Sequence, residues 1–105
     1  MLNQTASAMA HVVNLDIVPA DFDKFMDAAK ANAVASRNDP GCRDFLIMQA
    51  QDDPHHVMFV EVYDNAAALE AHHATDHFKT FVATTRDMVA KQEARQFSSV
   101  AMNMN

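Results

Sequence analysis

The chain has 105 residues, half of them hydrophobic, and a formal net charge of −6. This length fits one domain with a single small core. Lys and Arg number 8 and form no cluster, so binding to nucleic acid or to an anionic membrane is not expected, because both require a basic surface.

Cysteine content and the shortness of the apolar runs favour the cytoplasm. The lone Cys42 has no partner for an internal disulfide, which fits a reducing compartment. No apolar run approaches the roughly 18 residues that a membrane span needs. Residues 1–9 lack the basic head and the apolar core of a signal peptide. We expect them to form a disordered tail, followed by a single domain over residues 10–105.

The first part of the chain predicts a strand and then a long helix. Apolar residues alternate along residues 11–18, as in a strand with one buried face. A helix is predicted to follow as far as about Asn38, because apolar residues recur at helical spacing: Phe22, Phe25, Met26, Ala29 and Ala33. Asn32 and Ser36, four residues apart, form a polar line beside this apolar stripe.

The rest of the chain predicts three strands and two helices. We expect strands over residues 42–51 and 55–63, a short helix over 65–73, a longer helix over about 76–91 and a final strand over 96–102. Asn65 and Thr75 are the predicted N-caps of the two helices. This order predicts an α+β fold of the ferredoxin-like, split βαβ type, with a four-stranded antiparallel sheet and the helices on one face. The opposite face would be too apolar to remain in water.

Glu61 is the first candidate for chemistry. It lies on the same predicted strand face as Phe59 and Tyr63, so its carboxyl group should be buried. A buried carboxyl group is either paired or put to use. His72 ends the short helix and His77 begins the next one, so two imidazoles should lie nearby. Glu61 is expected to act as a base with a raised pKa or to orient His72.

These residues also have purely structural interpretations. Glu61 could satisfy backbone amides near the strand end, and His77 could only support a helix cap. Metal binding by the six histidines is not expected. His73 and His77 are four residues apart, a ligand spacing on one continuous helix, but Ala74-Thr75-Asp76 predicts a helix break. Cys42 has no histidine at a catalytic spacing, so it is not expected to act as a nucleophile.

The pattern around these residues resembles a known family. Glu61-x-Tyr63, Ala68-Leu69, His72, Thr75 and His77-Phe78 are similar to the antibiotic biosynthesis monooxygenases, which are small dimeric α/β-barrel proteins. The resemblance extends upstream to Asn32, Ser36, Pro40-Gly41-Cys42 and Phe45, and it covers roughly residues 10–100. It implies a homodimer formed through the sheet faces and a cavity between each sheet and its helices. The residues expected at that cavity are Asn14, Asn32, Ser36, Phe45, Phe59, Glu61, Tyr63, His72 and His77.

The resemblance implies a cofactor-independent monooxygenase that acts on a small quinol or aromatic substrate, because such family members oxidise reduced aromatics with O₂ and without flavin, metal or haem. His72 would be the leading acid–base group, with Glu61 as its orienter or as the base itself. Asn14, Asn32 and His77 would position the substrate and stabilise negative charge. Aromatic-polyketide members also use a tryptophan, which this chain lacks. Haem-degrading relatives need a histidine in the last helix, and residues 82–90 contain none.

Two other functions remain open. The chain is also similar to a branch of isomerases that act on a small phosphorylated dicarbonyl signal, through Asn32 with Ser36 and the run His72 to Thr80. In that branch Lys79 or Arg43 would meet the phosphate, although Ala33 stands where those isomerases have a histidine. The third function is a non-enzymatic dimeric module that binds an apolar metabolite. A cavity filled by Met and Phe side chains, without an ordered acid–base pair, would favour it.

Overall fold

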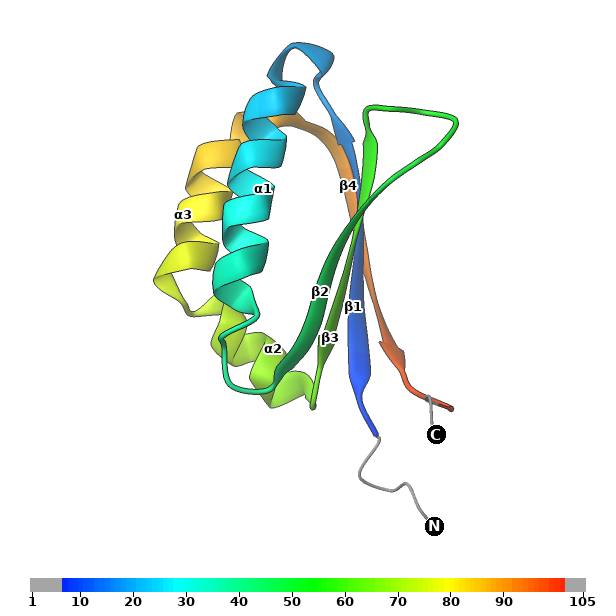
Figure 1. Ribbon diagram of the computed structural model, residues 1–105, viewed down its shortest axis with the longest axis vertical. Helices are drawn as coiled ribbons and strands as arrows, with labels where there is room; N and C mark the ends of the chain where they lie inside the picture. Colours follow the sequence, from blue (N-terminus) through cyan, green and yellow to red (C-terminus); the bar gives the residue numbers. More distant parts are fainter. Residues whose placement is uncertain (1–6, 102–105) are drawn as a thin grey trace.

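The computed structural model describes residues 7–101, which form one sheet with helices on one of its faces. The strands are β1 (Met9–Ile17), β2 (Cys42–Gln49), β3 (His56–Tyr63) and β4 (Val89–Ser98), and the helices are α1 (Phe22–Ser36), α2 (Ala66–His73) and α3 (Asp76–Thr85). Short 3₁₀ turns at Pro19–Asp21 and Arg86–Met88 join β1 to α1 and α3 to β4. Helices α1 and α3 lie side by side over one face of the sheet, and the other face is open (Figure 1).

The strand order is β2-β3-β1-β4, and every neighbouring pair is antiparallel. The expected ferredoxin-like α+β fold is therefore confirmed. Strand β1 is central and pairs on both sides, which places His11 opposite Glu61 of β3 and opposite Gln96 of β4. Side chains opposite each other in antiparallel strands point to the same face, so this register decides which polar groups meet.

The core forms where alternate residues of β1 and β3 meet the apolar stripe of α1. Val13 and Phe59 are opposite each other in the sheet, and Phe25 of α1 stacks on Phe59 with ring centroids 6.1 Å apart. Ala29 and Ala33, on the same helix stripe, are also buried. Their small side chains let the helix backbone approach the sheet, so the predicted stripe is the one that packs.

The expected boundary between the last helix and the last strand is wrong. Helix α3 ends at Thr85, and β4 begins at Val89, where the helix was expected to continue to residue 91. Strand β4 pairs with β1 from Ser98 opposite Met9 to Val89 opposite Ile17. These backbone hydrogen bonds override the helical propensity of the Lys-Gln-Glu segment that follows. The expected end of the strand, residue 102, lies outside the described residues.

The first strand begins slightly before its expected start at residue 11. Strand β1 runs from Met9 to Ile17, so it starts two residues earlier and ends one residue earlier than the expected strand over residues 11–18. The backbone N–H of Ala8 donates to Ser99 Oγ at 2.9 Å, and the N–H of Ser99 donates to the carbonyl oxygen of Ala8 at 2.9 Å. Residues 1–6 of the expected tail lie outside the described residues.

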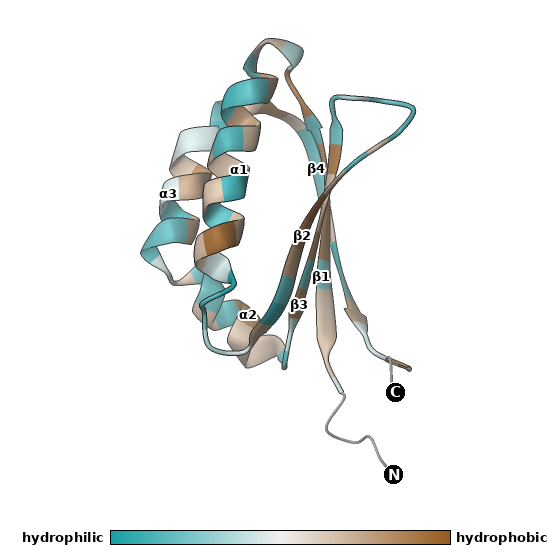
Figure 2. Ribbon diagram, in the orientation of Figure 1, coloured by the Kyte–Doolittle hydropathy of each residue, from teal (hydrophilic) through white to brown (hydrophobic). Residues whose placement is uncertain are grey.

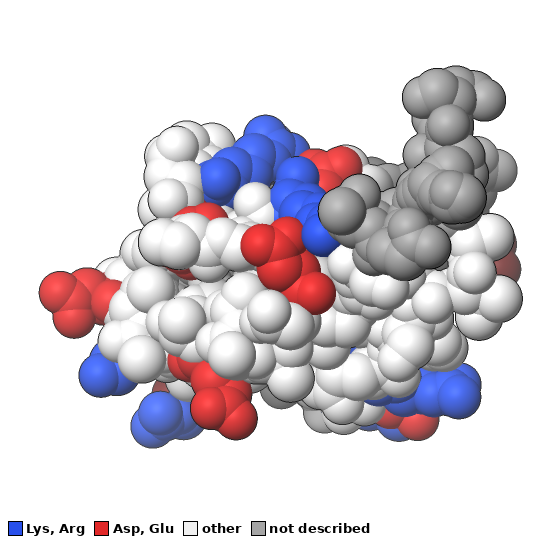
Figure 3. All heavy atoms as spheres, turned by 90° about the horizontal axis from the view of Figure 1, so that it is seen from below, with Lys and Arg blue, Asp and Glu red and all other residues white. Residues whose placement is uncertain are grey.

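Strands β2 and β3 are rich in hydrophobic residues (Figure 2), and alternate side chains along each strand point to the open face. Leu46 and Met48 of β2 are 40 % and 48 % exposed, which is high for large apolar side chains. Charged groups of both signs are scattered over the lower end of the molecule, where red groups lie among the blue ones (Figure 3). None of the described helices is long and apolar enough to cross a membrane.

Gly41 gives the first testable prediction. Its φ is +83°, and a Cβ built on it would lie 2.6 Å from Cβ of Ala68. Gly41→Ala should therefore lower the free energy of unfolding by roughly 2–4 kcal/mol, the sum of left-handed backbone strain and overpacking. Urea denaturation measures this change. Val34→Ala, at a residue 63 % exposed on α1, is the control and should change stability by less than about 0.5 kcal/mol. Equal stabilities of the two variants would contradict the prediction.

Candidate functional site

A cavity of about 350 Å³ lies between the sheet and the helices, at the lower end of the roughly 300–1,000 Å³ typical of ligand pockets. Its apolar wall comes from Val13, Leu15, Phe59, Phe78, Phe81, Val82 and Val89. Its polar lining comes from His11, Asn32, Glu61, His72, His73, Thr85, Arg86 and Gln92. The strand register places His11 and Glu61 together, and it places Gln92 opposite Leu15, farther along β1. Acid–base groups therefore gather at one end of an otherwise largely apolar cavity.

Glu61 is buried in this lining because it occupies an inward position of β3. Its exposed fraction is 4 %. Tyr63 lies two residues farther along the same strand face, and its hydroxyl group donates a hydrogen bond to Glu61 Oε1 at 2.7 Å. Burial raises the pKa of Glu61 to about 7, and the hydrogen bond from Tyr63 acts to lower it. Burial and the neighbouring carboxylate raise the pKa of Tyr63, so its hydroxyl stays protonated. Near neutral pH, Glu61 is ready both to accept and to donate a proton.

His72 is oriented by Asp39 rather than by Glu61. Its side chain is 1 % exposed, and Nδ1 donates to Asp39 Oδ2 at 3.0 Å. An ionised carboxylate only accepts hydrogen bonds, so the proton of the neutral imidazole is on Nδ1 and Nε2 carries a lone pair. Burial lowers the pKa of His72, whereas the hydrogen bond and charge of Asp39 act to raise it. Glu61 and His72 share the cavity lining, but among the described contacts no hydrogen bond joins them.

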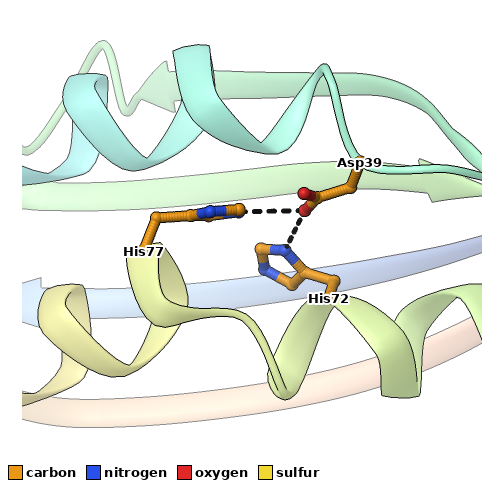
Figure 4. Close-up of side chains that lie close together, drawn as sticks. All are labelled: Asp39, His72 and His77. Carbon is orange, nitrogen blue, oxygen red and sulfur yellow. Dashed lines mark hydrogen bonds and ion pairs between the residues drawn. The ribbon is translucent and has the colours of Figure 1, made fainter.

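The same carboxylate oxygen accepts a second hydrogen bond from His77. Nε2 of His77 lies 2.9 Å from Asp39 Oδ2, and the two imidazoles approach Asp39 from α2 and α3 (Figure 4). Thr75 fixes the elbow between these helices, because its hydroxyl donates to the carbonyl oxygen of His72 at 2.7 Å and accepts from the N–H of Phe78. His77 lines a shallow hollow between α1 and α3 instead of the cavity.

The structure assigns His11 and His73 to the cavity, although neither was predicted there. Gln96 Nε2 donates to His11 Nδ1 at 2.9 Å, and the rings of His11 and His73 meet edge to face at 5.7 Å. Burial is the main cause that lowers the pKa of both histidines, and neighbouring imidazoles lower it further. His11 could have been found in the sequence, since it continues the alternation of Val13 and Leu15 by two residues.

Some of the remaining predicted residues line the cavity, and the others contact residues that line it. Asn32 and Phe59 line the cavity. Ser36 is fully buried on α1 and donates to the carbonyl oxygen of Asn32 at 2.6 Å, while Phe45 meets the ring of His72 edge to face at 6.1 Å. Tyr63 touches the cavity only through Glu61. These last three residues thus position the lining and do not form it.

Asn14 and Lys79 are not at the cavity. Asn14 lies on the open face of the sheet, where its Oδ1 is 2.9 Å from Nε2 of His56. The expectation that Asn14 converges with Glu61 is wrong, because strand alternation sends it to the face opposite His11 and Val13. Lys79 is exposed on α3. Arg43, the other proposed phosphate contact, donates from Nε to Asp64 Oδ1 at 2.6 Å.

The sequence matches the model of one known family, the antibiotic biosynthesis monooxygenases. The model of that family, described as "Antibiotic biosynthesis monooxygenase", matches residues 8–84, and the chain belongs to the family. The resemblance inferred from the Glu61 to Phe78 pattern is therefore confirmed.

The chain is also similar to one curated protein and to several solved structures. An uncharacterized protein of Synechocystis is 30 % identical over 78 residues, which cover 74 % of this chain and 53 % of that protein. The chain thus spans about half the length of this curated relative. A solved structure from Bacteroides thetaiotaomicron, provisionally named an antibiotic biosynthesis monooxygenase, is similar at a TM-score of 0.87 and 26 % identity, covering 96 % of this chain and 99 % of that one. A solved structure from Nitrosomonas europaea, also provisionally named an antibiotic biosynthesis monooxygenase, is similar at a TM-score of 0.86 and 24 % identity. The match covers 89 % of this chain and 99 % of that one, and it shows the fold alone.

The raised pKa of Glu61 predicts how stability depends on pH. The folded protein holds this proton up to about pH 7, whereas the unfolded chain releases it near its ordinary pKa of 4.5. Stability contributed by the neutral carboxyl group is therefore lost as pH rises from 4.5 to 7, by up to about 3 kcal/mol. Glu61→Gln removes this loss, so the variant should gain stability relative to the unmodified protein between pH 5 and pH 8.

Denaturant unfolding at both pH values measures this change. Glu70→Gln, at an exposed glutamate of α2, is the matched control and should leave the pH dependence unchanged. A Glu61→Gln variant whose stability follows the same pH curve as the unmodified protein would show that the carboxyl group titrates normally.

Proposed function

We propose that this chain is a cofactor-independent monooxygenase that oxidises a small quinol or reduced aromatic compound with O₂. One observation carries the proposal: Glu61 is a buried carboxyl group with a pKa of about 7 in the lining of a largely apolar cavity. Perturbed acids in a cavity are candidates for proton transfer. Membership of the antibiotic biosynthesis monooxygenase family supports a role of the monooxygenase type.

Glu61 is the base in this proposal. Its carboxylate takes the proton of a substrate hydroxyl group or of an activated C–H bond, which leaves an electron-rich substrate anion that reacts with O₂. A base is most effective when its pKa lies near the working pH. Tyr63 holds the carboxyl group in one orientation through the 2.7 Å hydrogen bond. The protonated acid then returns its proton to the departing oxygen atom.

The electrons of the reaction come from the substrate itself. When a ring CH₂ group becomes a carbonyl group, its carbon gives up four electrons, which reduce both atoms of O₂. One oxygen atom forms the new carbonyl group, and the other leaves as water with the two hydrogens. This balance requires no external reductant, so the residues only need to bind the substrate, move protons and stabilise negative charge.

The imidazoles and the aromatic wall supply binding. Because Asp39 holds the proton on Nδ1 of His72, Nε2 of His72 is available to accept a hydrogen bond from a substrate hydroxyl group. Gln96 donates to Nδ1 of His11, which leaves an N–H donor on Nε2 for a developing oxyanion. Phe59, Phe78 and Phe81 offer ring faces and edges to a flat substrate.

The isomerase function keeps one supporting observation. Arg86 lines the cavity and is a cation available to an anionic ligand such as a phosphorylated dicarbonyl. Lys79 and Arg43, the residues first expected to meet the phosphate, do not supply this contact. Proton transfer next to a carbonyl group would use the same Glu61 and His72, so the substrate panel described below separates the two reactions.

The partner in this proposal is a second copy of the chain, joined through the open sheet face. Large apolar side chains on that face, Leu46, Met48, Phe97 and the half-buried Met58, Val60 and Val62, are those a partner would cover. Their exposure is costly in water, at roughly 25 cal/mol for each Å² of apolar surface left uncovered. Pairing two such faces would give the barrel implied by the resemblance.

Oxygen uptake tests the proposed reaction. Metal-stripped protein should accelerate O₂ consumption by reduced naphthoquinols or anthrones above the uncatalysed rate. Glu61→Gln should lower kcat about 10²- to 10⁴-fold, since it removes the base. Asp39→Asn should lower kcat by a smaller factor, because it changes the tautomer of His72 but leaves the base in place. Phosphorylated dicarbonyls are assayed in parallel for isomerisation.

The control for this experiment is Glu70→Gln, which should retain full activity. Circular dichroism establishes that each variant is folded. No acceleration with any panel member, or equal rates for the unmodified protein and a folded Glu61→Gln, would overturn the monooxygenase proposal. Isomerisation without O₂ uptake would establish the alternative, and saturable binding without either reaction would establish the binding module.

The proposed dimer predicts a change of mass for a substitution on the sheet face. Val60→Glu places a charge among the apolar side chains of the open face, so it should convert a dimer into a monomer. Light scattering after size-exclusion chromatography measures the mass. Val34→Glu makes the same substitution on the helical side, at an exposed residue, and should stay dimeric. A monomeric unmodified protein, or a dimeric Val60→Glu, would contradict the prediction.

A further inference from the structure

A second constellation of side chains lies where α1, α2 and α3 meet, beside the cavity. Asp39 follows the end of α1, His72 ends α2, and His77 begins α3. One ligand atom of each residue lies within 4.8 Å of those of the other two. Nδ1 of His72 and Nε2 of His77 both approach Oδ2 of Asp39. The three side chains are 12 %, 1 % and 26 % exposed, so the cluster is largely shielded from water.

We propose that Asp39, His72 and His77 bind one divalent first-row transition-metal ion. Two imidazoles and one carboxylate are the donor set that zinc and non-haem iron use in proteins. Magnesium and calcium prefer oxygen ligands alone, so the two nitrogen donors disfavour them. The proposed oxidation needs no metal, but the two proposals share His72. An ion on Nδ1 of His72 would move the imidazole proton to Nε2 and so remove the acceptor that the oxidation uses.

The geometry is close to that of a metal site. Both imidazole nitrogens already point at a single carboxylate oxygen, at 3.0 Å from His72 and 2.9 Å from His77 (Figure 4). Ligand atoms about 2.0–2.2 Å from an ion in tetrahedral arrangement lie roughly 3.4 Å apart. A small movement of the side chains would therefore admit the ion. Each neutral imidazole would carry its proton on the other ring nitrogen, and the carboxylate would offset part of the ion's charge.

The backbone around the cluster holds the three donors in place. The N–H of Asp39 donates to the carbonyl oxygen of Ser36 at 2.9 Å, which fixes the turn after α1. Thr75 ties the end of α2 to the start of α3 through its two hydrogen bonds. His77 also lines the hollow between α1 and α3, together with Asn32 and Phe81. Of the three donors, His77 is the one that lines this hollow, so an ion and its fourth ligand, a water molecule, would enter from that side.

The spacing explains why the sequence did not predict this site. Asp39 is 33 residues before His72 and belongs to the turn that ends a helix. The pair considered in the sequence, His73 and His77, is separated by the predicted break, and His73 faces the cavity instead. The ligand partner of His77 is therefore His72, and the turn residue completes the set.

Cobalt binding tests the proposal. The metal-stripped protein is titrated with Co²⁺, whose visible absorption reports tetrahedral coordination, and Zn²⁺ is then added as competitor. We expect one equivalent of Co²⁺, displaced by Zn²⁺. Loss of an outer partner of a metal ligand already costs about 10- to 100-fold in affinity, so Asp39→Asn and His77→Gln should weaken binding at least that much.

Two variants serve as controls. His56→Gln removes a half-buried histidine that pairs with Asp16 on the open face, and Cys42→Ser removes the lone thiol. Both should bind Co²⁺ like the unmodified protein. Nitrogen chemical shifts of the imidazoles, recorded with and without Zn²⁺, require no substitution and should change most for His72 and His77. Absence of binding, equal binding by a folded His77→Gln, or shifts confined to other histidines would overturn the proposal.

Discussion

The register of β1 between β3 and β4 is the constraint on which the rest of the structure depends. Because β1 is paired on both sides, sliding it by one residue would turn its whole inner face outward. The observed register sets His11 opposite Glu61 and leaves Val13 and Leu15 to continue the wall. The polar and the apolar parts of the cavity wall on β1 thus follow from one alternating pattern. Helices α1 and α3 cover the cavity on the side opposite the sheet.

The turn after α1 is the second organising element. Asp39 receives an imidazole from each of two helices, so a single carboxylate fixes the angle between α2 and α3 as well as the tautomer of His72. The two hydrogen bonds are largely shielded from water. Charge-assisted hydrogen bonds are stronger in such an environment than at the protein surface. His72 belongs to both the cavity lining and the cluster.

Local patterns in the sequence predicted the order of the elements, both helix caps and the burial of Glu61, because each of these depends on residues within a few positions. Asn65 and Thr75 cap their helices as expected. The end of α3 could not be predicted in the same way, since the pairing of β4 with the distant β1 decides it. The placement of Asn14 at the cavity failed for a different reason: it rested on the family resemblance, whereas the alternation along β1 sends Asn14 to the face opposite Val13.

Asp39 escaped prediction because its partners are remote in sequence and its neighbours are turn-forming residues. Pro40 and Gly41 indicate the end of a helix, so the sequence places Asp39 in a turn. A turn position does not indicate that the carboxylate is buried or hydrogen-bonded. A buried hydrogen-bond acceptor at such a position is visible only when the helices that supply its donors have been packed together.

The proton on Glu61 would also decide which ligands the proposed site accepts at a given pH. Since this carboxyl group is half ionised near neutrality, the charge of the cavity changes by one across the physiological range. A neutral phenol is free to bind on the alkaline side and to share its proton with the carboxylate. An anion binds best on the acidic side, and on the alkaline side its binding draws one proton from the solvent. For any ligand that binds in this cavity, affinity and proton uptake would therefore be thermodynamically linked, with opposite signs for the two kinds of ligand.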